Sequence, residues 1–161
     1  MSTQKSLPTI PRKILAPVDF SDSSLRALAS AVDLAKHFRA TLLLVHVVPM
    51  LPPVSGADFF HETEYVRELQ RNAESRLRAI LAPILADGIA AESLVAVSND
   101  TAGEILRAAE HQHVDMIVIA THGLTGLRPL LFGSTTEKVT KLAHCNVLVI
   151  RVPRTQGSPT A

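Results

Sequence analysis

This sequence has few aromatic residues, one cysteine and no marked excess of positive or negative charge. It has no tryptophan, one tyrosine and one cysteine, and its 16 Lys and Arg residues nearly balance 15 Asp and Glu residues. A lone Cys145 cannot form an internal disulfide, and a net charge of +1 provides no field to attract nucleic acid or an anionic membrane. Because few aromatic rings are present to stack on bases, single-stranded nucleic acid is also disfavoured. We therefore predict no nucleic-acid partner.

Long apolar runs are missing as well. The longest apolar stretches, such as residues 80–86 and 116–120, are far shorter than the roughly 18 residues that a membrane-spanning helix needs. The polar segment before Arg12 lacks the apolar centre of a secretory signal, and a single unpaired cysteine suits a reducing compartment. We expect a cytoplasmic protein that does not contact a membrane.

The length of 161 residues fits one domain with a sizeable core. Both ends are polar and rich in Ser, Thr, Pro or Gly, which favours flexible tails at residues 1–11 and 153–161. The folded domain is then expected at residues 12–152. Its hydrophobic content of 47% with only 4% aromatics predicts a core of Leu, Val, Ile and Ala.

Short apolar runs alternate with amphipathic stretches throughout this domain. Residues 41–48 form a nearly unbroken apolar run, which is typical of a parallel strand covered by helices on both faces. The alternation predicts an α/β fold with an open, doubly wound parallel sheet and right-handed crossovers. Pro83 is expected to kink or end the second helix. The predicted strands are 13–18, 41–48, 92–97, 115–120 and 146–152. The first predicted helix begins near residues 21–24 and ends near residues 37–40, and the other three are 60–85, 101–111 and 134–143.

The segment 121–138 carries the clearest chemical signal. It contains three glycines and follows a buried strand, and open α/β sheets bind ligands at the carboxyl ends of their strands. Gly133 allows close backbone approach, and residues 134–136 place amides and hydroxyls on a first helical turn, as phosphate sites do. Ser134 followed by Glu137 is equally a capping box, which requires no ligand. The chain contains neither the G-x-x-x-x-G-K-[ST] nor the G-x-G-x-x-G fingerprint.

The spacing from Gly123 across nine residues to Gly133 and Ser134 resembles the G-2x-G-9x-G-[ST] ATP-binding signature of the universal stress protein family. The first glycine of that signature corresponds to Ala120 here. Its methyl group would weaken binding by about 1 kcal/mol if the position needs a positive φ or close approach to the ligand, and would cost nothing in ordinary strand conformation.

The resemblance extends well beyond this loop. The segments KILAPVDFS (residues 13–21), VHVV (45–48) and VLVI (147–150) are similar to the family's first, second and last strands, so the likeness covers about residues 12–152. It implies a five-stranded, Rossmann-like sheet of the adenine nucleotide alpha hydrolase type with strand order 3-2-1-4-5. Asp19 and Ala120 would then meet where the strand order reverses.

The resemblance also implies an adenine-nucleotide site. The residues that match the family's base-, ribose- and phosphate-binding positions are Pro17, Val18, Asp19, Val47, Ala120, His122, Gly123, Gly133, Ser134, Thr135 and Thr136. The Asp19 carboxylate can accept hydrogen bonds from a base amine or a sugar hydroxyl, or it can cap the first helix, a role that Ser21 could also fill. Val47 is either strand core or a surface against which the base packs. His46, on the same strand, is interpreted as a core histidine with its hydrogen bonds satisfied.

These features lead to one functional hypothesis and two alternatives. The resemblance implies a stress-response sensor or regulator that binds ATP, AMP or a related adenine nucleotide, with or without magnesium. The loop offers no evident general base and no acidic pair for magnesium, so we expect little or no catalysis and assign no catalytic residue and no protein metal site. The alternatives are a nucleotide-independent, dimeric interaction protein of the same fold and a slow ATPase. The apolar strand at residues 146–152 would lie at a sheet edge, where it predicts a homodimer formed by pairing with its copy.

Overall fold

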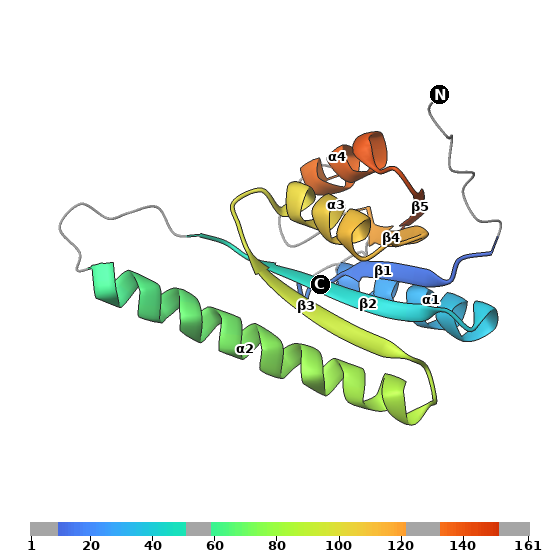
Figure 1. The fold of residues 1–161 in the computed structure, drawn as a ribbon, viewed down its shortest axis with the longest axis horizontal. Coiled ribbons are helices and arrows are strands. Elements are labelled where there is room, and N and C mark those ends of the chain that lie inside the picture. Colours follow the sequence, from blue (N-terminus) through green and yellow to red (C-terminus); the bar gives the residue numbers. More distant parts are fainter. Residues whose placement is uncertain (1–9, 51–58, 122–132, 152–161) are drawn as a thin grey trace, which may run out of the picture.

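In the computed structural model, the described residues form a parallel sheet with helices on both faces (Figure 1). The described residues are 10–50, 59–121 and 133–151. They include the strands β1 (Lys13–Pro17), β2 (Thr41–Val48), β3 (Ala91–Val97), β4 (Met116–Ala120) and β5 (Asn146–Ile150). The helices are α1 (Asp22–Phe38), α2 (Phe59–Ala86), α3 (Thr101–His111) and α4 (Ser134–Leu142). The sheet order is β3-β2-β1-β4-β5 and every neighbouring pair is parallel, which confirms the predicted fold.

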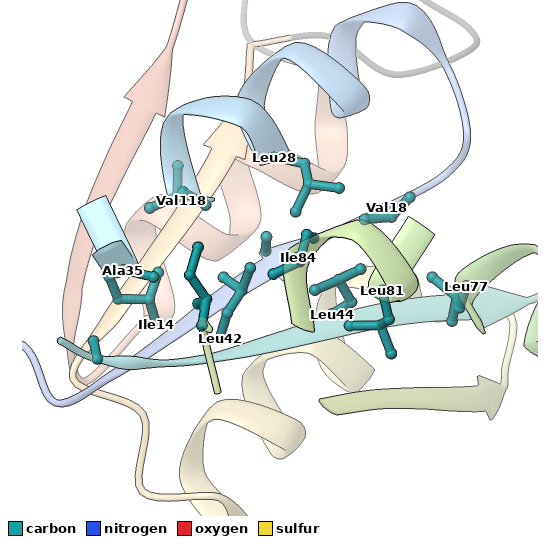
Figure 2. Close-up of a cluster of buried hydrophobic side chains, with 14 residues drawn as sticks. Ile14, Val18, Leu28, Ala35, Leu42, Leu44, Leu77, Leu81, Ile84 and Val118 are labelled. Atoms are coloured by element: carbon teal, nitrogen blue, oxygen red, sulfur yellow. The ribbon is translucent and has the colours of Figure 1, made fainter. Parts of the chain in front are cut away.

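Apolar side chains cover both faces of the sheet, as the unbroken hydrophobic runs predict. In the register of β1 and β2, Ile14 lies beside Leu42 on the face covered by α1 and α2. Leu15 lies beside Leu43 on the face covered by α3 and α4. Figure 2 shows the first of these two cores, in which Leu77 and other α2 side chains approach the sheet. The two cores hold the central strands rigidly between the helical layers.

The end of α2 lies close to the predicted limit, and it excludes one of the two roles expected of Pro83, that of ending the helix. The helix continues past this proline to Ala86. It ends in a turn where Gly88 has a φ of 78° and donates to Leu85, while Ile89 donates to the carbonyl of Ile84. Ile84 and Ile89 are both buried in the same core, and this apolar contact is what usually accompanies such a turn. Burial of Ile84 keeps the last turn helical although Pro83 cannot donate a helical hydrogen bond.

The two edges of the sheet are β3 and β5. The strand predicted at residues 146–152 ends at Ile150 in the structure, and Val152 lies outside the described residues. Leu148 on β5 is 37% exposed, so part of the apolar surface of this strand is uncovered in the single chain. Over the residues that the structure describes, no helix combines the length and apolar character required to cross a bilayer.

Candidate functional site

A cavity of about 240 Å³ lies at the carboxyl ends of β1 and β4. These strands are neighbours at the centre of the sheet, and the chain leaves β1 toward β2 on one side but leaves β4 toward β5 on the other. Loops that leave neighbouring strands in opposite directions create a crevice, where open α/β sheets bind their ligands. The cavity therefore lies where the fold itself favours a binding site.

Every predicted site residue that the structure describes lines this cavity. They are Pro17, Val18 and Asp19 from the end of β1, Val47 from β2, Ala120 from β4, and Gly133, Ser134, Thr135 and Thr136 from the start of α4. The remaining two, His122 and Gly123, lie outside the described residues. The fold thus brings together residues that are far apart in the sequence, while their role in ligand binding stays a prediction.

The start of α4 differs from the capping-box alternative. The cap residue is Gly133, which has no side chain to accept a capping hydrogen bond, and Ser134 is already the first residue of the helix. The first helical bond runs from the Glu137 amide to the Gly133 carbonyl at 2.9 Å, and the Glu137 carboxylate pairs with Lys141 instead of reaching back. In the described part of the chain, the amides of residues 134–136 have no helical acceptor, and they lie at the cavity. The capping-box interpretation of Ser134 is wrong, because the chain enters the helix one residue earlier.

Two hydrogen bonds tie this helix start to the end of β4. The Gly133 amide donates to the Thr121 carbonyl at 2.8 Å. The Thr136 hydroxyl donates to the Ala120 carbonyl at 2.7 Å, and both residues are buried. Thr136 was predicted to hold phosphate, and its hydroxyl proton is already committed to this bond. What it can still donate to an anion is its backbone amide.

Ala120 adopts ordinary strand conformation. It pairs with Ile150 of β5, and it is not among the described non-glycine residues with positive φ, which are Phe20, Arg39 and His113. Alanine therefore causes no backbone strain where the family signature has glycine. Its methyl group contributes to the cavity wall.

Asp19 lies at the cavity and organises the start of α1 through Ser21. One oxygen, Oδ1, accepts from the Ser21 amide at 2.9 Å and from the Ser21 hydroxyl at 2.5 Å. Ser21 is the cap, because its Oγ accepts from the Ser24 amide at 3.1 Å. Of the two capping candidates, Ser21 therefore performs that role. Asp19 supports the cap while lining the cavity.

Comparison with known proteins identifies the family. The sequence profile described as the universal stress protein family matches residues 11–151. The chain belongs to this family. Universal stress protein MJ0531 of Methanocaldococcus jannaschii is 37% identical over 146 residues, covering 89% of this chain and 84% of the relative. YxiE, a universal stress protein of Bacillus subtilis, is 32% identical to this chain, and the alignment covers 86% of this chain and 98% of YxiE. The solved structure of universal stress protein UspA from Lactobacillus plantarum matches with a TM-score of 0.76 at 27% identity, covering 86% of this chain and 97% of that one.

Several residues that line the cavity of this universal stress protein were not predicted. They are Ser24, Val45, His46, Thr101, Ile105 and Ile119. His46 was expected to be a core histidine with its hydrogen bonds satisfied. Its Nδ1 does lie 2.7 Å from the Val18 carbonyl, but the residue is half-buried and lines the cavity instead of the core. Thr101 and Ile105 belong to α3, and no sequence motif marked this helix as part of a binding site. Its position could have indicated this, because α3 begins after the carboxyl end of a parallel strand, at the same edge of the sheet that holds the cavity.

An ion pair connects the two helices that border the cavity. Lys138 on α4 reaches both carboxylate oxygens of Asp100 at 3.0 and 2.8 Å, and Asp100 also caps α3 by accepting from the Gly103 amide at 2.9 Å. The hydrogen bond from Lys138, followed by the one from Gly103, lowers the pKa of Asp100 below its usual value. A Cβ at Gly103 would lie 2.5 Å from Asp100 Oδ2, so glycine permits this close cap. Among the described residues, no group of three or more His, Cys, Asp or Glu is placed to hold a metal ion.

Proposed function

We propose that this universal stress protein binds ATP or a related adenine nucleotide in the cavity at the carboxyl ends of β1 and β4, and acts as a stress-response sensor or regulator. The observation that carries the proposal is the meeting of three chemically different surfaces in one cavity. They are the amide-rich start of α4, the Asp19 carboxylate, and apolar walls that include Val47 and Ile105.

Each surface suits one part of a nucleotide. The amides of residues 134–136 and the positive end of the α4 dipole favour phosphate oxygens. The Asp19 carboxylate can accept from ribose hydroxyls or a base amine, and apolar side chains such as Val47 can pack against a planar base. His122 and Gly123 are predicted to complete the phosphate side.

Structures of other family members support the choice of an adenine nucleotide. A universal stress protein solved in complex with cAMP, and one from Archaeoglobus fulgidus solved in complex with dAMP, share this fold with TM-scores of 0.57 and 0.56. Their identities to this chain are 21% and 22%, so the similarity concerns the fold. We take from them that a sheet of this kind can hold an adenine nucleotide.

Binding is proposed without efficient turnover. Among the described lining residues, Asp19 is the only carboxylate, whereas phosphoryl-transfer sites place several groups around the metal, the nucleophile and the γ-phosphate. Any magnesium would then be held mainly by the phosphates. A slow ATPase remains the last of the three hypotheses, and it requires turnover that exceeds that of a Gly133→Asp variant.

Co-purification is the primary test. Protein purified without added nucleotide is denatured with acid, and the released small molecules are identified by chromatography and mass spectrometry. Calorimetry with ATP, AMP and GTP then measures affinity. Gly133→Asp places a carboxylate beside the α4 amides and should weaken ATP binding more than about tenfold through charge repulsion.

The matched control is Gly88→Asp. It adds the same charge in the turn that follows α2, where a built Cβ meets no atom within 4 Å, and this variant should bind ATP as the parent protein does. If no nucleotide co-purifies and millimolar ATP gives no heat, the function is instead that of a nucleotide-independent interaction protein.

We also propose that the chain forms a cytoplasmic homodimer, with its folded domain at residues 12–152 and no nucleic-acid partner. The family match over 11–151 supports those domain limits, and the exposed Leu148 on the edge strand β5 supports pairing through residues 146–152. Light scattering at micromolar concentration should give the mass of a dimer, and a monomer there would contradict the pairing.

A further inference from the structure

A strained residue lies next to Asp19 in the turn between β1 and α1. Phe20 has a φ of 63°, in the left-handed region that bulky side chains rarely adopt. Its neighbours on the two sides are Asp19, which lines the cavity, and Ser21, which caps α1. Such a conformation persists only when surrounding contacts hold it in place. The contacts of Phe20 therefore determine how Asp19 is presented to the cavity.

Two side chains from other elements contact the Phe20 ring. The Arg76 guanidinium of α2 lies 3.8 Å from the ring centroid, a cation–π geometry. The His46 ring of β2 lies 4.5 Å away at a tilt of 40°, and its Nδ1 bonds the Val18 carbonyl just before the turn. We refer to Arg76, Phe20 and His46 as the turn stack.

Arg76 is placed for this contact by the core. The next residue, Leu77, is fully buried in the same cluster as Val18 from the end of β1, and Figure 2 shows both side chains in that cluster. Within the described residues Arg76 forms no ion pair, whereas Arg71 on the same helix pairs with Glu64. The Phe20 ring is thus the specific contact of the Arg76 head group.

We infer that Arg76 is a positioning residue for the nucleotide site. By holding the Phe20 ring over α2, it keeps the left-handed turn in which Asp19 faces the cavity and accepts from the Ser21 amide. This inference rests on the proposed function for its effect on ligand affinity. None of the described lining residues belongs to α2. The contact of Arg76 with Phe20 nevertheless makes this helix a contributor to binding.

The test compares arginine variants on one helix. Arg76→Met keeps the aliphatic stem and removes the cation, and Arg78→Met is the matched control because Arg78 is also exposed on α2. A cation–π contact at an exposed site corresponds to a loss of ATP affinity of about two- to fivefold in Arg76→Met. Arg78→Met should bind as the parent does, and Arg76→Lys, which retains a cation, should recover part of the loss.

A double-mutant cycle separates positioning from general destabilisation. If Arg76 acts through Asp19, adding Arg76→Met to Asp19→Asn should cause little further loss of affinity. Full additivity of the two losses, or equal affinities of Arg76→Met and Arg78→Met, would overturn the inference.

A ligand-free measurement keeps the inference distinct from the proposed function. The Ser21 amide donates to Asp19, so its hydrogen exchange reports the geometry of the turn. Exchange should be faster in Arg76→Met than in Arg78→Met and the parent protein. If the parent binds no nucleotide, the proposed function fails, and unchanged Ser21 exchange in Arg76→Met would separately refute the positioning role.

Discussion

Removing the hydroxyl of Thr136 is a direct test of how the start of α4 is held at the cavity. This hydroxyl donates to the Ala120 carbonyl at 2.7 Å, and the two residues are only 3% and 7% exposed. Thr136→Val keeps the side-chain shape and removes the donor. Loss of the bond beside a buried carbonyl costs about 1–3 kcal/mol, and the added methyl group recovers up to about 0.8 kcal/mol. The net free energy of unfolding should fall by about 1–2 kcal/mol.

Thermal denaturation followed by circular dichroism measures this change. For a domain of this size, 1 kcal/mol lowers Tm by about 3 °C, so we expect a decrease of about 3–6 °C. The control is Thr135→Val on the same helical turn, since Thr135 is half-buried and its hydroxyl makes no described hydrogen bond; its effect should stay within about 0.5 kcal/mol. Equal Tm values for the two variants would show that packing of the buried Val139, rather than the Thr136 bond, holds α4 in place.

Two further predictions concern Asp100 and Gly88. The folded pKa of Asp100 lies below its usual value of 3.8, so its stabilising effect is present above that pH and is lost as the pH falls through the lower folded pKa. Asp100→Asn should therefore lower Tm at about pH 7, with the gap from the parent narrowing at about pH 3; a constant gap in these melts would contradict the role of the charge. At Gly88, where φ is 78° and an added Cβ meets no atom within 4 Å, alanine should cost about 1 kcal/mol through backbone strain alone and asparagine less. Urea denaturation measures both, and an alanine variant as stable as the parent would refute the strain argument.

Most of the fold could be predicted from apolar runs and helical periodicity. Residues 41–48 form a strand with the predicted limits because the run is buried on both faces of the sheet. The strand order came from the family resemblance, since local patterns do not say which strands are neighbours. The helix predicted at residues 60–85 was also found, but that Pro83 does not end it could not be inferred, because this depends on Ile84 reaching a core formed by distant parts of the chain.

Site residues that belong to a sequence motif were predicted, whereas those whose position depends on tertiary packing were missed. Ser134 and Glu137 fit a capping box by spacing, but which residue caps a helix depends on where the incoming chain turns, and here it turns at Gly133. Ile105 on α3 has the same apolar character whether it faces a core or a cavity, so its place in the wall could not be inferred. Likewise, no pattern indicates that Arg76 on α2 contacts Phe20, because the two residues meet only through the tertiary fold.

The bond between the Gly133 amide and the Thr121 carbonyl has a consequence for variation and engineering. It clamps the points where residues 122–132 leave β4 and rejoin the chain at α4. Because both partners in this bond are backbone atoms, the start of α4 stays linked to the end of β4 whichever side chains occupy positions 121 and 133. Substitutions at these two positions can therefore change the chemistry beside the cavity without removing the link that holds the α4 amides there.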